Sequence, residues 1–185
     1  ESQATRPFGV CILMDESGSM QEPMRIQVSM VKVLHKTFSQ ILPPDRLWVY
    51  GHDSEGSTAR INIYQDPCNN KFLDTIWAAS ARGGTPDLTT IQAIYKKIRE
   101  STNEDMIFIY SCDGQPDGGT KSIALIKKVV EKMKRDGFVT IGIGICNQSV
   151  KEIYNYYTVI DNPETELVRN VSYIVNHVVK TEFQS

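Results

Sequence analysis

The sequence predicts an α/β domain in which helices cover both faces of a doubly wound, mostly parallel sheet with one antiparallel edge strand. Short and nearly continuous apolar runs recur along the chain, and such runs are typical of strands buried on both faces. Segments with apolar residues at helical spacing alternate with these runs, as in parallel α/β folds. One further run alternates apolar and polar residues, which indicates an edge strand with one face in water.

The predicted strands are short. The apolar runs lie at residues 8–14, 46–50, 106–110 and 138–145. In residues 60–64, Ile61 and Ile63 alternate with polar neighbours, and a predicted turn at residues 53–56 precedes this segment. We therefore expect residues 46–50 and 60–64 to pair as an antiparallel hairpin at the sheet edge.

The predicted helices alternate with these strands. They cover residues 23–42, 86–99 and 120–136, and a last helix begins at Asn162-Pro163. Pro43-Pro44 ends the first helix, because proline cannot continue it. Thr85 is the expected N-cap of the second helix, with Pro86 at its first position. Gly137 is the expected end of the third helix.

Length, charge and composition exclude several classes of function. The 185 residues suit one domain over residues 1–185, with a core at about 8–180, and the Glu at position 1 suggests a piece excised from a longer chain. The net charge of −2 argues against nucleic-acid binding, which requires a basic domain. The apolar runs are shorter than a membrane span, so we expect no membrane partner.

The four cysteines are expected to be reduced thiols. None of them belongs to a CxxC pair or lies beside a histidine, so zinc binding is not indicated. Cys11, Cys112 and Cys146 lie in or beside apolar runs and are expected to pack as small hydrophobic residues, whereas Cys68 lies in a polar loop. Reduced thiols favour a reducing, cytoplasmic compartment.

Three loops bring oxygen-bearing side chains to one edge of the predicted sheet. In an open α/β sheet, ligands bind beyond the carboxyl ends of the strands. Two of the loops follow strands and one precedes a helix, and together they supply Asp15, Ser17, Ser19, Thr85 and Asp113. Two carboxylates and three hydroxyls are hard donors that suit Mg²⁺ or Mn²⁺. The alternative is turn and helix-cap chemistry, which the same residue types favour.

These motif parts resemble the metal-ion-dependent adhesion site (MIDAS) of von Willebrand factor A-type (VWA) domains, which have a Rossmann-like fold. The parts are Asp15-x-Ser17-x-Ser19, Thr85 after a Gly-Gly pair, and Asp113 before a glycine, in the family's order. The resemblance implies that Ser17 and Ser19 contact the metal directly, and that Thr85 and Asp113 do so directly or through water. It also implies that a carboxylate of a partner protein completes the coordination.

The details are similar to intracellular, bacterial-type VWA domains. Ser-Gly-Ser-Met at residues 17–20, Gly-Gly-Thr-Pro at 83–86 and Asp-Gly-x-Pro at 113–116 resemble the accessory subunits of cobaltochelatase and magnesium chelatase and other partners of AAA+ ATPases. Cys112 departs from this branch, which usually has Ser or Thr before the aspartate. The resemblance implies a AAA+ ATPase or a chelatase-type complex as the partner.

Residues beside the predicted ligands have two open interpretations each. Glu16, Met20, Glu22, Arg82 and Gln115 either shape partner choice or are ordinary loop surface. His52, Asp53 and Glu55 follow the second strand and form either a second cation site or a solvated hairpin turn. Gly142 and Gly144 superficially resemble a dinucleotide fingerprint, but their position inside a strand indicates close packing instead. Tyr154, Tyr156 and Tyr157 are either an exposed aromatic patch or half-buried.

An alternative function is a Mg²⁺-dependent phosphohydrolase with Asp15 as its nucleophile. Such enzymes also place an aspartate after the first strand, but they need an acid two residues later, where this chain has Ser17. The sequence also contains no GxSxG elbow, P-loop or HExxH helix. We therefore predict a non-catalytic module that binds a divalent cation and captures an acidic residue of a partner protein.

Overall fold

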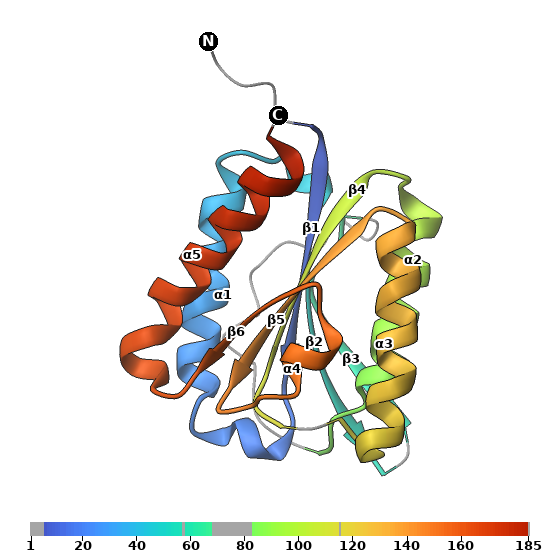
Figure 1. The fold of residues 1–185 in the computed structure, drawn as a ribbon, viewed down its shortest axis with the longest axis vertical. Helices are drawn as coiled ribbons and strands as arrows, with labels where there is room; N and C mark the ends of the chain where they lie inside the picture. Colours follow the sequence, from blue (N-terminus) through green and yellow to red (C-terminus); the bar gives the residue numbers. More distant parts are fainter. Residues whose placement is uncertain (1–5, 57, 68–82, 115, 185) are drawn as a thin grey trace.

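A six-stranded sheet in the order β3-β2-β1-β4-β5-β6 forms the centre of the protein (Figure 1). The structure is a computed structural model and describes residues 6–56, 58–67, 83–114 and 116–184. The strands are β1 (Phe8–Asp15), β2 (Leu47–Glu55), β3 (Thr58–Gln65), β4 (Asp105–Cys112), β5 (Phe138–Ile145) and β6 (Tyr156–Ile160). Only β3 runs antiparallel, paired with β2. The predicted fold class is confirmed.

Two strands differ from the sequence prediction. β2 continues to Glu55 instead of ending at Tyr50, because the polar residues that follow remain paired with β3, as His52 is with Ile61. β6 was not predicted, and it adds a parallel edge strand beside β5. Tyr156 is half-buried and Tyr157 is exposed in β6, as expected for a strand at the edge of a sheet.

The long helices lie close to their predicted positions, with short corrections at their ends. They are α1 (Met24–Ser39), α2 (Asp87–Ser101), α3 (Gly119–Arg135) and α5 (Pro163–Phe183), with a one-turn helix α4 (Val150–Ile153) between β5 and β6. α1 ends before Leu42, whose backbone N–H closes a turn onto Phe38. Pro86, not Thr85, occupies the N-cap position of α2, so the prediction of Thr85 as the cap was wrong.

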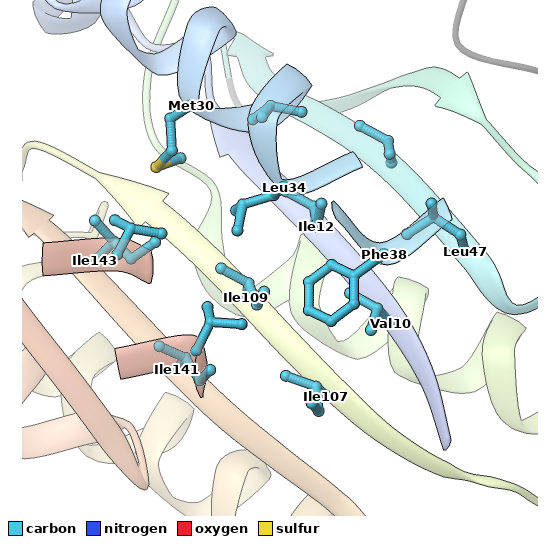
Figure 2. Close-up of a cluster of buried hydrophobic side chains, with 14 of the residues drawn as sticks. Val10, Ile12, Met30, Leu34, Phe38, Leu47, Ile107, Ile109, Ile141 and Ile143 are labelled. Carbon is cyan, nitrogen blue, oxygen red and sulfur yellow. The ribbon is translucent and has the colours of Figure 1, made fainter. Parts of the chain in front are cut away.

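Two apolar layers hold the helices on opposite faces of the sheet, as Figure 1 shows. One layer packs α1 and α5 against the strands. Figure 2 shows part of it, in which Met30, Leu34 and Phe38 of α1 cover residues of β1 and β4 such as Ile12 and Ile109. The other layer packs α2, α3 and α4 against the opposite face. Burial on both faces explains why these strands are apolar at nearly every position.

Gly142 and Gly144 allow α4 to approach β5 closely, which confirms close packing as their role. A Cβ at Gly144 would lie 2.1 Å from the carbonyl oxygen of Asn147 and 2.9 Å from Cγ2 of Val150. At Gly142 it would lie 2.4 Å from the Tyr154 ring. The strand is therefore in direct contact with the segment that follows it, and no phosphate cradle is needed to explain the glycines.

Replacing Gly144 with alanine is expected to lower the free energy of unfolding by about 2 kcal/mol, since the obstructing atom belongs to the backbone and cannot move aside cheaply. Urea denaturation measures this effect. The matched control is Gly114→Ala, because a Cβ at Gly114 would meet no atom within 4 Å. Equal stability of the two variants would show that α4 is not held against β5.

Candidate metal centre

The carboxyl ends of β1 and β4 lie side by side and carry the two predicted carboxylates. β1 pairs with β4 in parallel up to Met14 opposite Ser111, so Asp15 and Asp113 both stand just beyond this register. In Figure 1 these strand ends lie at the lower edge of the sheet. The central position of the two strands therefore brings together two residues that are far apart in the sequence.

A chain of hydrogen bonds joins four of the five predicted ligands. Oδ1 of Asp15 accepts a hydrogen bond of 2.8 Å from the backbone N–H of Ser17. The hydroxyl oxygens of Ser17 and Ser19 lie 3.1 Å apart. The Ser19 hydroxyl donates to Oδ1 of Asp113 at 2.7 Å. These contacts place Asp15, Ser17, Ser19 and Asp113 in one polar cluster.

Backbone contacts hold the fifth residue, Thr85, in the adjacent loop. The N–H of Gly18 donates to the carbonyl of Gly83 at 2.9 Å, which ties this loop to the Ser17–Ser19 turn. Gly83 has a φ of +65°, and a Cβ there would lie 1.9 Å from the carbonyl oxygen of Ser54. Glycine is therefore required at position 83 both by the backbone angle and by the close approach of β2.

Asp117 is a residue of this site that the sequence analysis missed. Its Oδ2 accepts the N–H of Thr85 at 3.1 Å, and its own N–H donates to the Thr85 carbonyl at 3.0 Å. This reciprocal pair joins the Thr85 loop to the segment between β4 and α3. The available signal was a second aspartate four residues after Asp113, in the same loop.

Asp15 is the most perturbed carboxylate of the cluster. Its side chain is 0% exposed, and Oδ2 has no hydrogen-bond partner among the described residues. Burial raises its pKa to about 6, and the nearby charge of Asp113 adds to the rise, while hydrogen bonding by Ser17 and by the backbone of Asp113 acts in the opposite direction. An orphaned buried carboxylate oxygen beside a second carboxylate and two hydroxyls fits the donor chemistry of Mg²⁺ or Mn²⁺.

The donor set depends on hydroxyl groups as well as carboxylates. Within residues 6–56, 58–67, 83–114 and 116–184, no three His, Cys, Asp or Glu side chains group together as metal ligands. An ion at this cluster would therefore need Ser17, Ser19 and Thr85 as well as Asp15 and Asp113. Such a mixed oxygen set suits a hard cation and excludes a soft metal that prefers thiolate or imidazole.

Two of the residues predicted to flank the ligands are not at the surface. Glu16 is 0% exposed and accepts hydrogen bonds from the Tyr64 hydroxyl at 2.7 Å and from Nδ2 of Asn62 at 2.9 Å. Met20 is buried in a small apolar cluster with Met24. The interpretation of these two residues as ordinary loop surface was therefore wrong, and in this structure neither side chain is accessible to a partner. Glu22 is exposed, and Arg82 and Gln115 lie outside the described residues.

His52 and Asp53 belong to β2 and not to a solvated turn or a second cation site. Asp53 forms an ion pair of 2.6 Å with Arg60, and Glu55 is the exposed end of the strand. His52 is fully buried, and burial lowers its pKa to about 3, so the ring is neutral. The prediction for these residues was wrong because β2 extends further than its apolar run.

A buried polar network lies around His52. The Tyr110 hydroxyl donates to Oδ1 of Asp87 at 2.5 Å, and its oxygen lies 2.9 Å from Nε2 of His52. Nδ1 of His52 lies 2.9 Å from the Thr90 hydroxyl. Because the ring is neutral, these contacts require a proton on Nε2, with Nδ1 accepting from Thr90. The network ties β2 and β4 to the first turn of α2, two residues after Thr85.

Replacing Tyr110 with phenylalanine is expected to lower the free energy of unfolding by about 2 kcal/mol, because Asp87 and His52 both lose a buried partner. Chemical denaturation at neutral pH measures the loss. Tyr173→Phe is the control, since Tyr173 is 74% exposed and should tolerate the change. A Tyr110 variant as stable as this control would mean that the network contributes nothing to stability.

The three described cysteines are free thiols, but only two are buried. Cys11 and Cys112 pack in the layer beneath α2 and α3, as expected. Nδ2 of Asn147 lies 3.5 Å from the Cys112 sulfur and donates to the Gly114 carbonyl at 2.9 Å, so this side chain supports the loop that carries Asp113. Cys146 is exposed, which corrects the prediction that it packs inside. Cys68 lies outside the described residues.

The fold and the motif order define a known class of domain. The von Willebrand factor type A domain family matches residues 10–176. The chain therefore belongs to the VWA family, whose members are protein-interaction modules. No curated protein matches the chain.

Solved structures with the same fold are distant in sequence. A von Willebrand factor type A protein from Catenulispora acidiphila is 18% identical with a TM-score of 0.62, and the match covers 90% of this chain and 41% of that one. The pilus adhesin SpaC from Lactobacillus rhamnosus GG is 13% identical with a TM-score of 0.71, covering 96% and 30%. The SpRpn10 VWA domain is 14% identical with a TM-score of 0.67, covering 94% and 95%. Identities this low show a shared fold and nothing finer.

The chain spans less than half of the first two proteins. Other structures with this fold include a minor pilin, PilB from Streptococcus sanguinis. Among the described residues, every helix is too short or too polar to cross a bilayer.

Proposed function

We propose that this chain is a non-catalytic protein-interaction module that holds Mg²⁺ or Mn²⁺ through Asp15, Ser17, Ser19, Thr85 and Asp113. The partner is a protein that offers an Asp or Glu side chain to the ion. When bound, the ion supplies a Lewis-acidic position for that carboxylate. The five side chains hold the ion, and the surrounding loops orient the partner.

The observation that carries this proposal is the unpartnered Oδ2 of Asp15. A buried carboxylate oxygen without a hydrogen bond costs free energy, so a chain that retains one generally has a use for it. A chain of hydrogen bonds runs from the Asp15 carboxylate through Ser17 and Ser19 to Asp113. The cluster therefore requires little rearrangement to present several oxygens to one cation.

Burial of Asp15 also favours binding over catalysis. A phosphohydrolase nucleophile must reach the phosphorus of its substrate, but the Asp15 side chain is 0% exposed. Ser17 stands where such an enzyme would need a second acid, and its hydroxyl contacts Ser19 instead. These features support a carboxylate that holds a cation from below the surface.

For the partner, we propose a AAA+ ATPase or another subunit of a chelatase-type complex in the cytoplasm. The support is the likeness of the three loop motifs to the VWA domains of such complexes. Free thiols at Cys11, Cys112 and Cys146 agree with a reducing compartment.

A pull-down with the immobilised chain tests the proposed function. Lysate proteins are captured in Mg²⁺, in Mg²⁺ followed by EDTA, and by a Ser17→Ala variant, and the bound proteins are identified by mass spectrometry. We expect at least one protein to be retained only by the wild type in Mg²⁺. If the wild type and the variant retain the same proteins with and without EDTA, the proposal is wrong.

A further inference from the structure

A groove of about 360 Å³ opens beside Asp113. Its apolar lining includes Ile26 of α1, Ile145 at the end of β5 and Pro163 at the start of α5. Asp113 also lines it, so the groove is continuous with the candidate metal centre. Its volume is at the lower end of the range for small binding pockets. We call this feature the acidic groove, because its charged lining is entirely negative in the described part of the chain.

The charges of the acidic groove come from Glu22, Glu164 and Asp113. Glu22 and Glu164 are both exposed, and neither forms an ion pair within the described residues. Glu166, two residues further along the first turn of α5, has partners. Its Oε2 accepts the backbone N–H groups of Asp161 and Asn162 at 3.2 and 3.4 Å, so hydrogen bonds that Glu164 does not form within the described residues compensate its charge.

A bound divalent cation would leave the negative charge of the groove uncompensated. Asp15 and Asp113 together balance the two positive charges of the ion. Glu22 and Glu164 then remain as two unpaired carboxylates beside the position where the partner's acid would bind. They repel a partner segment that is acidic throughout, and they attract one that carries a positive charge near its acidic residue.

We propose that the acidic groove receives a Lys or Arg side chain from the same partner segment whose Asp or Glu reaches the metal centre. This inference rests on the proposed function and specifies its partner. The cation pairs with Glu22 and Glu164, while the aliphatic stem of the side chain covers Ile26, Ile145 and Pro163. The partner is therefore a protein segment with an acidic and a basic residue within about five positions, which an extended chain can span.

Cys146 provides a built-in reporter for occupation of the groove. It lines the groove, is exposed, and has a φ of +53°, a left-handed angle that is uncommon outside glycine. Its N–H donates to the Ile160 carbonyl at 2.8 Å, so the end of β6 holds this conformation. A side chain seated in the groove should slow alkylation of the Cys146 thiol.

A peptide selection tests the inference. Twelve-residue peptides with one central Asp and randomised flanks are selected on the chain in Mg²⁺ and, separately, in EDTA. We expect the Mg²⁺-dependent peptides to be enriched in Lys or Arg within about five residues of the Asp. Their affinity should fall roughly tenfold for the Glu22→Gln/Glu164→Gln double variant, because two exposed ion pairs are lost. The same peptides should protect Cys146 from alkylation in the wild type.

The matched control is Glu131→Gln/Glu152→Gln, which removes two exposed carboxylates that do not line the groove. This control should bind the peptides as the wild type does. Mg²⁺-dependent peptides without a basic preference, or with unchanged affinity for the groove variant, would overturn this inference and leave the proposed function intact. If no peptide binds in a Mg²⁺-dependent manner, both are wrong.

Discussion

Asp113→Ala is expected to weaken Mg²⁺ binding by more than about 100-fold, since the loss of an outer-shell partner alone costs about 10- to 100-fold in metal sites. Asp113 supplies one of the two carboxylates and accepts the hydrogen bond from Ser19. The expected loss therefore includes both a charge and the orientation of a neighbouring hydroxyl. Isothermal titration calorimetry with MgCl₂ measures the affinity directly.

The fold of this variant should remain intact, because Asp113 is half-buried in a loop and contributes nothing to the apolar layers. In the wild type, Mg²⁺ should raise the melting temperature, since a ligand that binds only the folded state stabilises it. The variant should show no such rise. Glu131→Ala, an exposed change on α3, should behave as the wild type. A Mg²⁺ response that survives in Asp113→Ala would remove this residue from the site.

Asp15→Asn is expected to stabilise the metal-free chain at neutral pH relative to the wild type. The pKa of Asp15 is about 6 in the folded chain, whereas a fully solvated aspartate, as in the unfolded chain, has a pKa of 3.8. The folded chain therefore holds the proton more tightly between these values, and its stability falls as the pH rises through them. The full difference corresponds to about 3 kcal/mol above pH 6.

The Asn side chain of the variant does not titrate. The free energy of unfolding of the variant relative to the wild type should therefore increase with pH. Most of the change of about 3 kcal/mol should develop between about pH 4 and pH 6.5. Denaturation curves in EDTA at several pH values measure it. Asn can still accept the hydrogen bond from the Ser17 N–H, which limits other effects of the change. A constant difference between variant and wild type across this range would show that Asp15 is not perturbed as described.

Addition of Mg²⁺ should reverse the order of stability at pH 7. The wild type gains stability from the bound ion, whereas Asp15→Asn loses a ligand and gains little. The buried carboxylate thus costs stability in the free chain and becomes favourable when a cation compensates its charge. Such an exchange of stability for binding is common at functional sites.

The fold class could be predicted from the sequence because each strand or helix has a recognisable pattern of apolar residues within its own short segment. The apolar runs that became β1, β4 and β5 are buried on both faces, so they are apolar at nearly every position and can be recognised without knowledge of their partners. The sequence did not predict β6, because an edge strand need not be apolar at every position, and Tyr157 in β6 is exposed. The polar half of β2 was missed for a related reason, since its side chains find their hydrogen-bond and ion-pair partners on other elements of the fold.

The candidate site was also accessible from the sequence, because parallel strands place their following loops at one edge of the sheet. This rule predicted that Asp15 and Asp113 lie close together, without knowledge of any contact between them. It did not identify Asp117, whose role depends on its reciprocal hydrogen bonds with Thr85. It also could not separate Glu16, which turns inward to Tyr64, from Ser17, which faces the site.

The sequence by itself therefore determined the α/β class, the alternation of strands and helices, and the set of loops that meet at one edge. The tertiary structure decided which residues of those loops are buried, which carboxylates have partners, and where a negatively charged groove lies. The physical reason is that the apolar patterns of strands and helices repeat over a few residues, so each pattern can be recognised within one short segment of the sequence. Burial and the pairing of charges depend on neighbours such as Asn62 and Tyr64 for Glu16, which only the folded chain brings into contact.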